Sequence, residues 1–373
     1  MAGKEDCRKD WTTMINANLN KAKKAKNDEF YTLYSDVAKE LAHYQQHFKG
    51  KIIYCNCDNP EWSEFWRYFH INFSAMGLKK LIATYKGTPT YKLDYTGGND
   101  IDVTVGLRTL LKGDGDFRSQ ECLDILKVAD IVVTNPPFSI AREYYIPTLY
   151  KYNKKFLIVG DLNWVTYKNV FPLFQSNQIW LGVNSIKEFL QPDGTMKKFG
   201  NKLWYTNLSH DKRHTKINCH RRYSEAEYVK YDNYNAIDCC PTSTIPVDYD
   251  GVMGVPISYL IHHNPDQFEI VGMSCKWNTD MLTKTYNKNQ LQHTWDKSSK
   301  SFKYPIKVAK LNDGCPIIRL DKPYTNATYY EIEGEFYARK YDRIFIRREL
   351  GTWTVRGVTH LELPLSKNVK TIK

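Results

Sequence analysis

Short apolar runs alternate with amphipathic segments along the first 210 residues of the chain. The apolar runs are rich in β-branched and aromatic residues and are bounded by turn-forming residues, which is typical of buried strands. Strands are expected at residues 52–54, 79–85, 130–134, 156–160, 179–182 and 202–208. Helices are expected at residues 36–48, 61–77, 119–129, 140–152 and 165–175. This alternation predicts an α/β fold with a parallel sheet that carries helices on both faces.

The pattern changes near residue 210, after which Tyr, Asp, Asn and Pro become frequent and helical periodicity fades. We therefore expect two regions, residues 1–210 and residues 211–373. Within the first region, residues 86–106 are rich in Gly and Thr and fit a hairpin or an irregular excursion.

Charge is distributed unevenly along the chain. The sequence has 53 Lys and Arg against 41 Asp and Glu, a formal net charge of +12. Residues 273–373 alone hold 19 Lys and Arg and 10 Asp and Glu, a net charge of +9. A basic region favours a polyanionic partner, because neutralised phosphates release counterions. A well-solvated basic surface is the alternative explanation.

Cysteine usage and hydropathy exclude several classes of protein. The nine cysteines are odd in number and form no C-x2-C pair, which argues against a disulfide framework or a zinc ribbon. His210, His214, Cys219 and His220 lie in a polar basic stretch that a loop explains, and we expect no metal. No apolar run approaches the ~18 residues of a membrane helix, and the N-terminus is polar. These features predict a cytoplasmic protein with reduced thiols and no membrane association.

The sequence Asn-Pro-Pro-Phe at residues 135–138 follows an apolar strand and carries the clearest chemistry. An exocyclic amine on a nucleobase is a weak nucleophile, because its lone pair is delocalised into the ring. If the Asn135 side chain and the Pro136 carbonyl accepted hydrogen bonds from its two N–H groups, the lone pair would be localised on the nitrogen for attack on a methyl sulfonium. Pro136 and Pro137 stiffen the loop, and Phe138 would stack on a base extruded from a duplex.

This motif predicts a methyltransferase, with a purely structural turn as the alternative. The same motif serves enzymes that act on RNA amines or on a protein glutamine amide. The basic C-terminal region would be unexplained in a glutamine methyltransferase. Cytosine-C5 methylation uses a Pro-Cys motif, which this sequence lacks.

Further motifs resemble the EcoRI-type adenine-specific DNA methyltransferases over roughly residues 20–272. In matching order they are KAKKAKNDEFYT (21–32), IIYCNCDNP (52–60), GLKKLIA (77–83), GDGDFRS (113–119), DIVVTNPPFS (130–139), IWLG (179–182), LWYTNL (203–208), KYDNYNAI (230–237), IPVDYDGVMGVPI (245–257) and NPDQFEIVG (264–272). The resemblance implies a Rossmann-like S-adenosylmethionine-dependent methyltransferase domain followed by a smaller C-terminal target-recognition region.

The resemblance also implies which residues bind S-adenosylmethionine. The matching positions are Phe30, Tyr31, Thr32, Cys55, Cys57, Asp58, Pro60, Asp116, Phe117 and Asn135. The loop after the first strand departs from the usual glycine-rich pattern. Asp58 and Asp116 are also typical of helix caps and turns, Thr32 of a cap, and the aromatic residues of a core.

Two basic clusters are candidates for contact with double-stranded DNA. They comprise Lys212, Arg213, Lys216, Arg221 and Arg222 in the first cluster, and Arg339, Lys340, Arg343, Arg347 and Arg348 in the second. The second cluster alternates with apolar residues, so one of its faces is also a candidate for core packing.

The hypothesis from sequence is a monomeric, site-specific DNA adenine-N6 methyltransferase that acts on a flipped adenine. It would serve a restriction-modification system or protect phage DNA, in a bacterial or phage-infected cell. The alternatives are an RNA amine methyltransferase and a non-catalytic DNA-binding protein that retains the fold.

Overall fold

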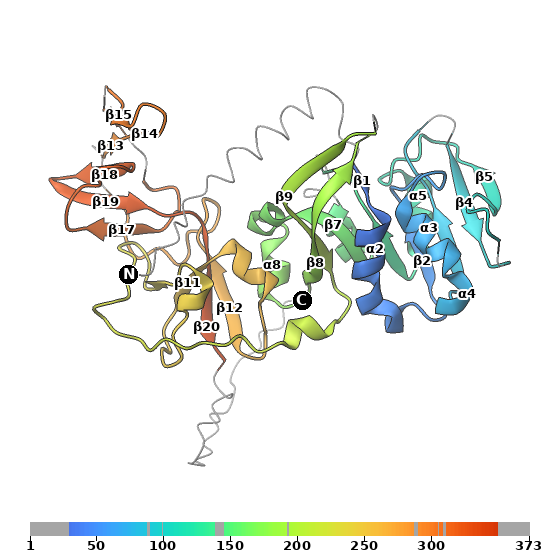
Figure 1. The fold of residues 1–373 in the computed structure, drawn as a ribbon, viewed down its shortest axis with the longest axis horizontal. Coiled ribbons are helices and arrows are strands. Elements are labelled where there is room, and N and C mark those ends of the chain that lie inside the picture. The colour runs from blue at the N-terminus through green and yellow to red at the C-terminus, as the bar shows by residue number, and fades with distance from the viewer. Residues whose placement is uncertain are drawn as a thin grey trace, which may run out of the picture.

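A nine-stranded mixed sheet organises the N-terminal part of the computed structural model (Figure 1). The structure describes residues 30–349, apart from 88–89, 99, 139–144, 192–193, 287–289, 305 and 309–310. In spatial order the strands are β1 (Tyr31–Thr32), β8 (Trp180–Leu190), β9 (Met196–Thr206), β7 (Lys155–Asp161), β6 (Ile131–Thr134), β2 (Ile52–Cys55), β3 (Lys80–Ala83), β4 (Tyr91–Tyr95) and β5 (Leu107–Leu110).

The predicted parallel sheet is correct only for the four central strands. β7, β6, β2 and β3 run parallel, whereas the strands on either side of them are antiparallel. β4 and β5 form an antiparallel pair that flanks residues 96–106, which supports the hairpin interpretation of that region. β8 and β9 form a long hairpin, of which the sequence pattern predicted only the ends nearest the core.

Helices pack against this sheet and begin at recognisable caps. They are α2 (Tyr34–Leu41), η1 (Ala42–His47), α3 (Glu64–Ile71), α4 (Phe73–Met76), α5 (Gln120–Val128), α7 (Ile146–Lys151), η3 (Leu162–Thr166) and α8 (Phe171–Gln175). Ser63 caps α3 and Ser119 caps α5, each accepting backbone N–H bonds from the first turn. Gly77, with φ of 62°, ends α4 where a left-handed residue is needed.

Several helix predictions differ from the structure. The helix expected at 61–77 is divided into α3 and α4, and the one expected at 36–48 continues from α2 into the 3-10 helix η1. The single helix expected at 165–175 is wrong: η3 ends first, and α8 begins separately with Pro172 in its first turn. Proline lacks the N–H that a continuous helix would need there. Of the helix expected at 140–152, residues 140–144 lie outside the described residues and α7 forms the remainder.

The chain after residue 210 is built from small sheets and short 3-10 turns in its described part. The turns are η4 (Asp211–His214), η5 (Thr242–Thr244) and η6 (Ile257–Ile261). A four-stranded sheet contains β10 (Ile237–Asp238), β11 (Met253–Pro256), β20 (Arg343–Arg348) and β12 (Phe268–Met273). A five-stranded sheet contains β16 (Lys307–Val308), β13 (Leu291–His293), β18 (Tyr329–Ile332), β19 (Glu335–Arg339) and β17 (Ile317–Leu320), and β14 (Trp295–Asp296) pairs with β15 (Ser301–Phe302).

The four-stranded sheet shares the main hydrophobic core with the nine-stranded sheet. Phe268 and Ile346 belong to that core, and the Gln175 side chain of α8 donates a 3.0 Å hydrogen bond to the Val271 carbonyl of β12. The five-stranded sheet has a separate small core. In the described ranges, every helix is too short or too polar to span a lipid bilayer.

Candidate active site

A cavity of about 520 Å³ opens at the carboxyl ends of the parallel strands β2 and β6. Its wall gathers segments that are far apart in the sequence. They are residues 30–32, 56–59, 62–65, 85–87, 115–118 and 135–138. A doubly wound sheet offers a crevice at this edge, because the loops after adjacent strands diverge there.

Asp58 lies in the wall of this cavity and is tied to two neighbouring elements. Its carboxylate accepts hydrogen bonds from Ser63 Oγ at 2.8 Å and from Thr134 Oγ1. Ser63 is the cap of α3 and Thr134 is the last residue of β6, so Asp58 links the loop after β2 to the strand that directly precedes Asn135. Burial raises the pKa of Asp58 to about 7.

The raised pKa of Asp58 predicts a specific dependence of stability on pH. A carboxyl whose pKa is higher in the folded than in the unfolded chain stabilises the fold fully below its unfolded pKa, and that contribution is lost as pH rises through about 7. Lowering the pH from about 8 to about 5 should therefore raise the free energy of unfolding of the wild type relative to Asp58→Asn by about 2 kcal/mol.

Urea unfolding of both proteins across this pH range measures that difference. Asp124→Asn is the matched control, because Asp124 is exposed and Lys127 holds its carboxyl pKa below the ordinary value. A wild-type-to-variant difference for Asp58 that does not change with pH would contradict the prediction.

Asp116 and Phe117 form the part of the wall contributed by the loop before α5. The Arg118 guanidinium binds both Asp116 oxygens, at 2.9 and 2.7 Å, and Lys86 Nζ lies 3.2 Å from Oδ2. These hydrogen bonds, that from Arg118 first, hold the pKa of Asp116 well below its usual range, so it is an ionised acceptor. Phe117 is buried and packs edge-on against Tyr145 at 4.9 Å. The Asp116 side chain also accepts a hydrogen bond from the Arg118 backbone N–H. This bond is typical of a turn, the structural role that the sequence analysis gave as the alternative for Asp116.

Asn135 presents an unused acceptor at the cavity. Its Nδ2 donates to the Phe30 carbonyl at 2.5 Å, which fixes the orientation of the amide. Its Oδ1 is buried and has no hydrogen-bond partner among the described residues. A buried, unpaired acceptor is costly, so a site that keeps one is typically built to receive a ligand donor. The buried Thr32 Oγ1 also lacks a partner in the described chain, and Thr32 lies in β1 rather than at a helix cap.

Phe138 is held by a charged pair that the sequence analysis did not identify. Lys202 Nζ lies 4.1 Å from the centre of the Phe138 ring and 2.8 Å from Asp161 Oδ2. Lys202 and Asp161 are both buried, and Asn201 Nδ2 donates to Asp161 Oδ1 at 2.6 Å. The Phe30 ring lies at 6.1 Å from the Phe138 ring with 21° between their planes. The Phe138 ring thus has a fixed position at the cavity wall.

Comparison with known proteins supplies the family. The profile described as "Adenine-specific methyltransferase EcoRI" matches residues 18–313. The chain is 45% identical to the type II methyltransferase M.EcoRI of Escherichia coli over 293 residues, covering 69% of this chain and 89% of that protein. It is 38% identical to M.MpnI of Mycoplasma pneumoniae over 276 residues, covering 68% of this chain and 84% of that protein. This chain belongs to the EcoRI family of adenine-specific methyltransferases.

A further relative is M.MgeORF184P of Mycoplasma genitalium, 38% identical over 275 residues, covering 68% of this chain and 85% of that protein. No solved structure matches the chain. The resemblance seen in the motifs is therefore confirmed at the level of the family.

Two of the cofactor residues implied by the EcoRI-type motifs do not line the cavity. Cys55 ends β2 inside the core, and Pro60 is buried beyond the lining residues of its loop. Burial raises the pKa of the Cys55 and Cys57 thiols, so both are neutral. Cys57, in contrast to Cys55, does line the cavity. No cluster suited to a metal ion occurs in the described part of the chain.

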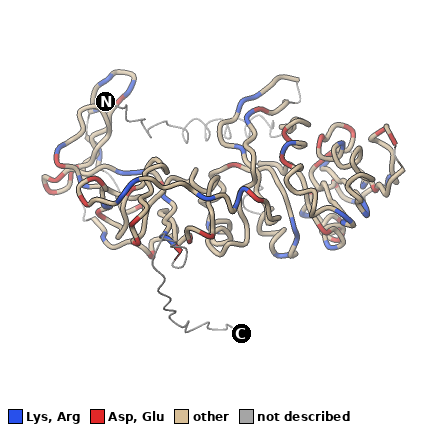
Figure 2. The backbone as a smooth tube through the Cα atoms, turned by 60° about the horizontal axis from the view of Figure 1, so that its bottom comes forward, with Lys and Arg blue, Asp and Glu red and all other residues tan. Residues whose placement is uncertain are grey.

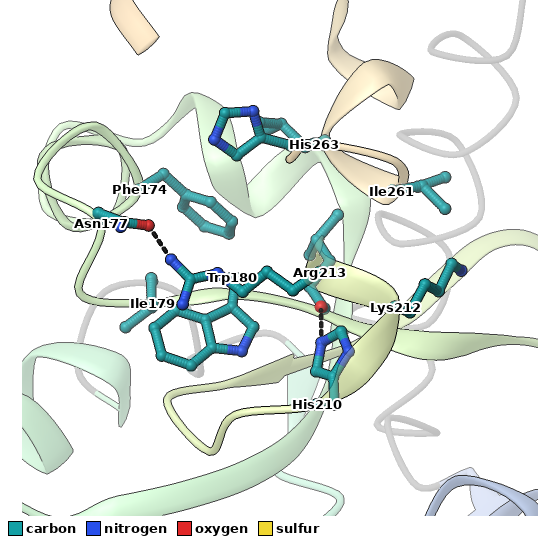
Figure 3. Close-up of a pocket in the computed structure, with 11 residues that line it drawn as sticks. Phe174, Asn177, Ile179, Trp180, His210, Lys212, Arg213, Ile261 and His263 are labelled. Carbon is teal, nitrogen blue, oxygen red and sulfur yellow. Dashed lines mark hydrogen bonds between the residues drawn. The ribbon is translucent and has the colours of Figure 1, made fainter. Parts of the chain in front are cut away.

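Two residues of the first basic cluster make contacts within the protein. Figure 3 shows Arg213 over the Trp180 ring, and its guanidinium lies 3.7 Å from the ring centre and donates to Asn177. Lys212 Nζ donates to the Val183 carbonyl at 2.5 Å. Burial lowers the pKa of both groups. These contacts attach η4 to β8, whereas Lys216, Arg221 and Arg222 are exposed.

The second basic cluster is also largely engaged in internal contacts. Arg343 is only 4% exposed and donates to Asp238 at 3.1 Å, which argues against contact with a phosphate. Arg339 lies 2.6 Å from Asp313, and Arg347 pairs with Glu269 at 2.5 Å. Lys340 lies 3.9 Å from Asp238. Arg348 donates to the Pro246 carbonyl, and its guanidinium lies 5.0 Å from the centre of the Phe268 ring. Alternation with apolar residues in β20 therefore marks core packing at Arg343, whereas Arg347 of the same strand is exposed.

Proposed function

We propose that this chain is a site-specific DNA methyltransferase that transfers a methyl group from S-adenosylmethionine to N6 of an adenine flipped out of the duplex. Membership of the EcoRI family establishes adenine specificity, and the curated relatives named above are type II methyltransferases. The observation that carries the proposal is Asn135 Oδ1, which lies beside Pro136 at the wall of a ligand-sized cavity and is buried without a partner among the described residues.

The residues at this wall fit the acceptance of an amine. Asn135 Oδ1 accepts one N6–H bond of adenine and the Pro136 carbonyl accepts the other. Both acceptors are preorganised, Asn135 by its bond to Phe30 and Pro136 by the rigid loop. With both N–H bonds held, the lone pair is directed away from the ring plane and would attack the methyl group. The N–C bond would form as the C–S bond of the sulfonium breaks, which leaves S-adenosylhomocysteine, and N6 would release one proton to water. Phe138 stacks on the extruded adenine and limits its orientation.

The remaining cavity fits S-adenosylmethionine, which supplies an electrophilic methyl group. Asp116 presents an ionised acceptor for the adenine moiety of the cofactor, and Phe117 an apolar face. Phe30, Tyr31 and Thr32 form another part of the wall, where the buried Thr32 Oγ1 has no partner among the described residues. Asp58 holds the loop after β2 in place beside Cys57. The mixture of apolar walls and a few polar groups is typical of a cofactor pocket.

We further propose that residues 211–373 form the target-recognition region and that residues 1–210 form the Rossmann-like methyltransferase domain. Of the first basic cluster, Lys216, Arg221 and Arg222 are exposed and suited to phosphate contact. Arg222 is 84% exposed despite lying 3.6 Å from Asp248, so exchanging that ion pair for a phosphate costs little.

Transfer of a labelled methyl group tests the proposed function. The purified chain is incubated with S-adenosylmethionine in two parallel reactions, one with double-stranded DNA and one with RNA, each of mixed sequence. The nucleosides of each reaction are then analysed by mass spectrometry. We expect N6-methyldeoxyadenosine among the DNA nucleosides and no label in RNA. Mapping of methylated adenines in the intact DNA should place them at one short sequence. Label in RNA alone would support the RNA amine alternative, and no label in either would support the non-catalytic alternative.

A further inference from the structure

A basic hairpin projects from the five-stranded sheet on the same side of the molecule as the β8–β9 hairpin (Figures 1 and 2). β13 pairs with β16, and β14 pairs with β15 farther along the same segment. The described residues of 291–304 and 306–308 therefore form one ribbon, with residues 297–300 at its tip. We define this segment as the lysine ribbon. The tip and the returning strand, residues 297–308, contain four lysines and no acidic residue.

The lysines of this ribbon are available to a ligand, in contrast to the arginines of β19 and β20. Lys297, Lys300 and Lys307 are exposed and have no ion-pair partner among the described residues. Lys303 Nζ forms an ion pair with Asp296 Oδ2 at 3.3 Å. Beside them, Tyr304 is 81% exposed and Val308 is 76% exposed. The ribbon therefore holds exposed lysines without an ion-pair partner in the described chain, whereas Arg339, Arg343 and Arg347 of the second basic cluster each pair with a carboxylate.

The base of the ribbon is rigid. His293 stacks on Tyr329 with 4.4 Å between ring centres, and Trp295 packs edge-on against Phe302 at 5.0 Å. The Trp295 backbone N–H donates to Thr328 Oγ1 at 3.0 Å. At the tip, Asp296 accepts bonds from the backbone and side chain of Ser298, at 2.9 and 2.6 Å. A ribbon fixed in this way presents its lysines with a small loss of conformational freedom on binding.

Its position relative to the active site fits a duplex that reaches both. The β8–β9 hairpin contributes Phe189 and Phe199, which pack on Phe30 at the wall of the cavity. The lysine ribbon extends toward the same side of the molecule as this hairpin (Figure 2). A duplex with its target base in the cavity would therefore extend its flank toward the ribbon. The major groove of B-form DNA admits a two-stranded ribbon, and lysines contact the phosphates along its edges.

We propose that the lysine ribbon is a DNA-contact element that enters the groove beside the target site and neutralises phosphates through Lys297, Lys300 and Lys307. The inference rests on the proposed DNA substrate. It assigns the phosphate contacts of the C-terminal region to the ribbon instead of to the arginines of β19 and β20.

The test compares two triple variants of the full chain by fluorescence anisotropy, with labelled duplexes that contain or lack the target sequence. Lys297→Gln, Lys300→Gln and Lys307→Gln together should weaken DNA binding at least ~10-fold. The slope of log affinity against log salt should fall by about 2 to 3, because each phosphate contact contributes about 0.9. The loss should be the same for both duplexes, and S-adenosylmethionine affinity should be unchanged.

The matched control replaces Lys49, Lys51 and Lys79 with Gln. These lysines are exposed and lie at the amino-terminal ends of β2 and β3, the opposite edge of the sheet from the cavity. The control should bind DNA with nearly the wild-type salt slope. An unchanged slope in the ribbon variant, or an equal decrease in both variants, would overturn the ribbon proposal. Because wild-type methylation of DNA is measured separately, failure of the ribbon leaves the proposed function intact.

Discussion

Replacing Asn135 with alanine is expected to lower methyl transfer at least about 100-fold, the effect of removing one preorganised polar group from a reacting centre. The lost Oδ1 is the acceptor that has no partner within the described protein, and the lost Nδ2 is the donor to the Phe30 carbonyl. The other segments of the cavity wall do not depend on that bond, so the variant should keep most of its affinity for S-adenosylmethionine. Single-turnover rates measure the chemical step, and calorimetric titration measures cofactor affinity.

Asn135→Asp separates the acceptor from the positioning role of the same side chain. Aspartate retains an acceptor oxygen but loses the Nδ2–H bond to the Phe30 carbonyl. Its rate should lie between those of the wild type and the alanine variant. Near-normal single-turnover rates in a folded alanine variant would disprove amine activation by Asn135.

The position of the active site could be predicted because the chemistry directly follows buried strands. Asp58 comes after β2 and Asn135 after β6, and two adjacent parallel strands necessarily bring their carboxyl ends to one edge. Asp116 and Phe117 also line the cavity, but they follow the exposed edge strand β5, and the sequence indicated them through the resemblance. The resemblance also implied Cys55, whose buried side chain ends β2 before the chain leaves the sheet.

The supporting contacts of the site could not be predicted in the same way. Lys202 stands in an apolar strand, where sequence periodicity cannot distinguish a buried lysine from an exposed one. Its partner Asp161 ends a different strand, and only the antiparallel register of β7 and β9 places them opposite each other. Arg343 is a comparable case: its charge suggested a DNA contact, but Asp238 of the distant β10 neutralises it in the core. Such pairings depend on tertiary register, which local sequence does not encode.

Removing the charged pair beneath Phe138 should have the second largest effect on catalysis. Lys202→Met alone would leave Asp161 buried without a counter-charge, which typically costs 3–5 kcal/mol or about a third of a fold's stability. The double change Asp161→Asn and Lys202→Met removes both charges and retains an acceptor for the Asn163 backbone N–H. We expect this double variant to fold and to transfer methyl groups about 10- to 100-fold more slowly, since small misplacements at a reacting centre carry costs of this order.

A double-mutant comparison with Phe138→Ala tests whether the pair acts through the Phe138 ring. Phe138→Ala alone should weaken stacking of the target base by about 1–3 kcal/mol, and Phe138→Trp should recover much of that loss. If Lys202 acts by fixing the ring, neutralising the pair in the Phe138→Ala background should slow transfer further by less than about 2-fold. Fluorescence of 2-aminopurine at the target position gives a second readout, because a loosely held extruded base changes its stacking environment. A full additional 10-fold loss without Phe138, in a protein of wild-type thermal stability, would show that the pair acts on the active site by another route.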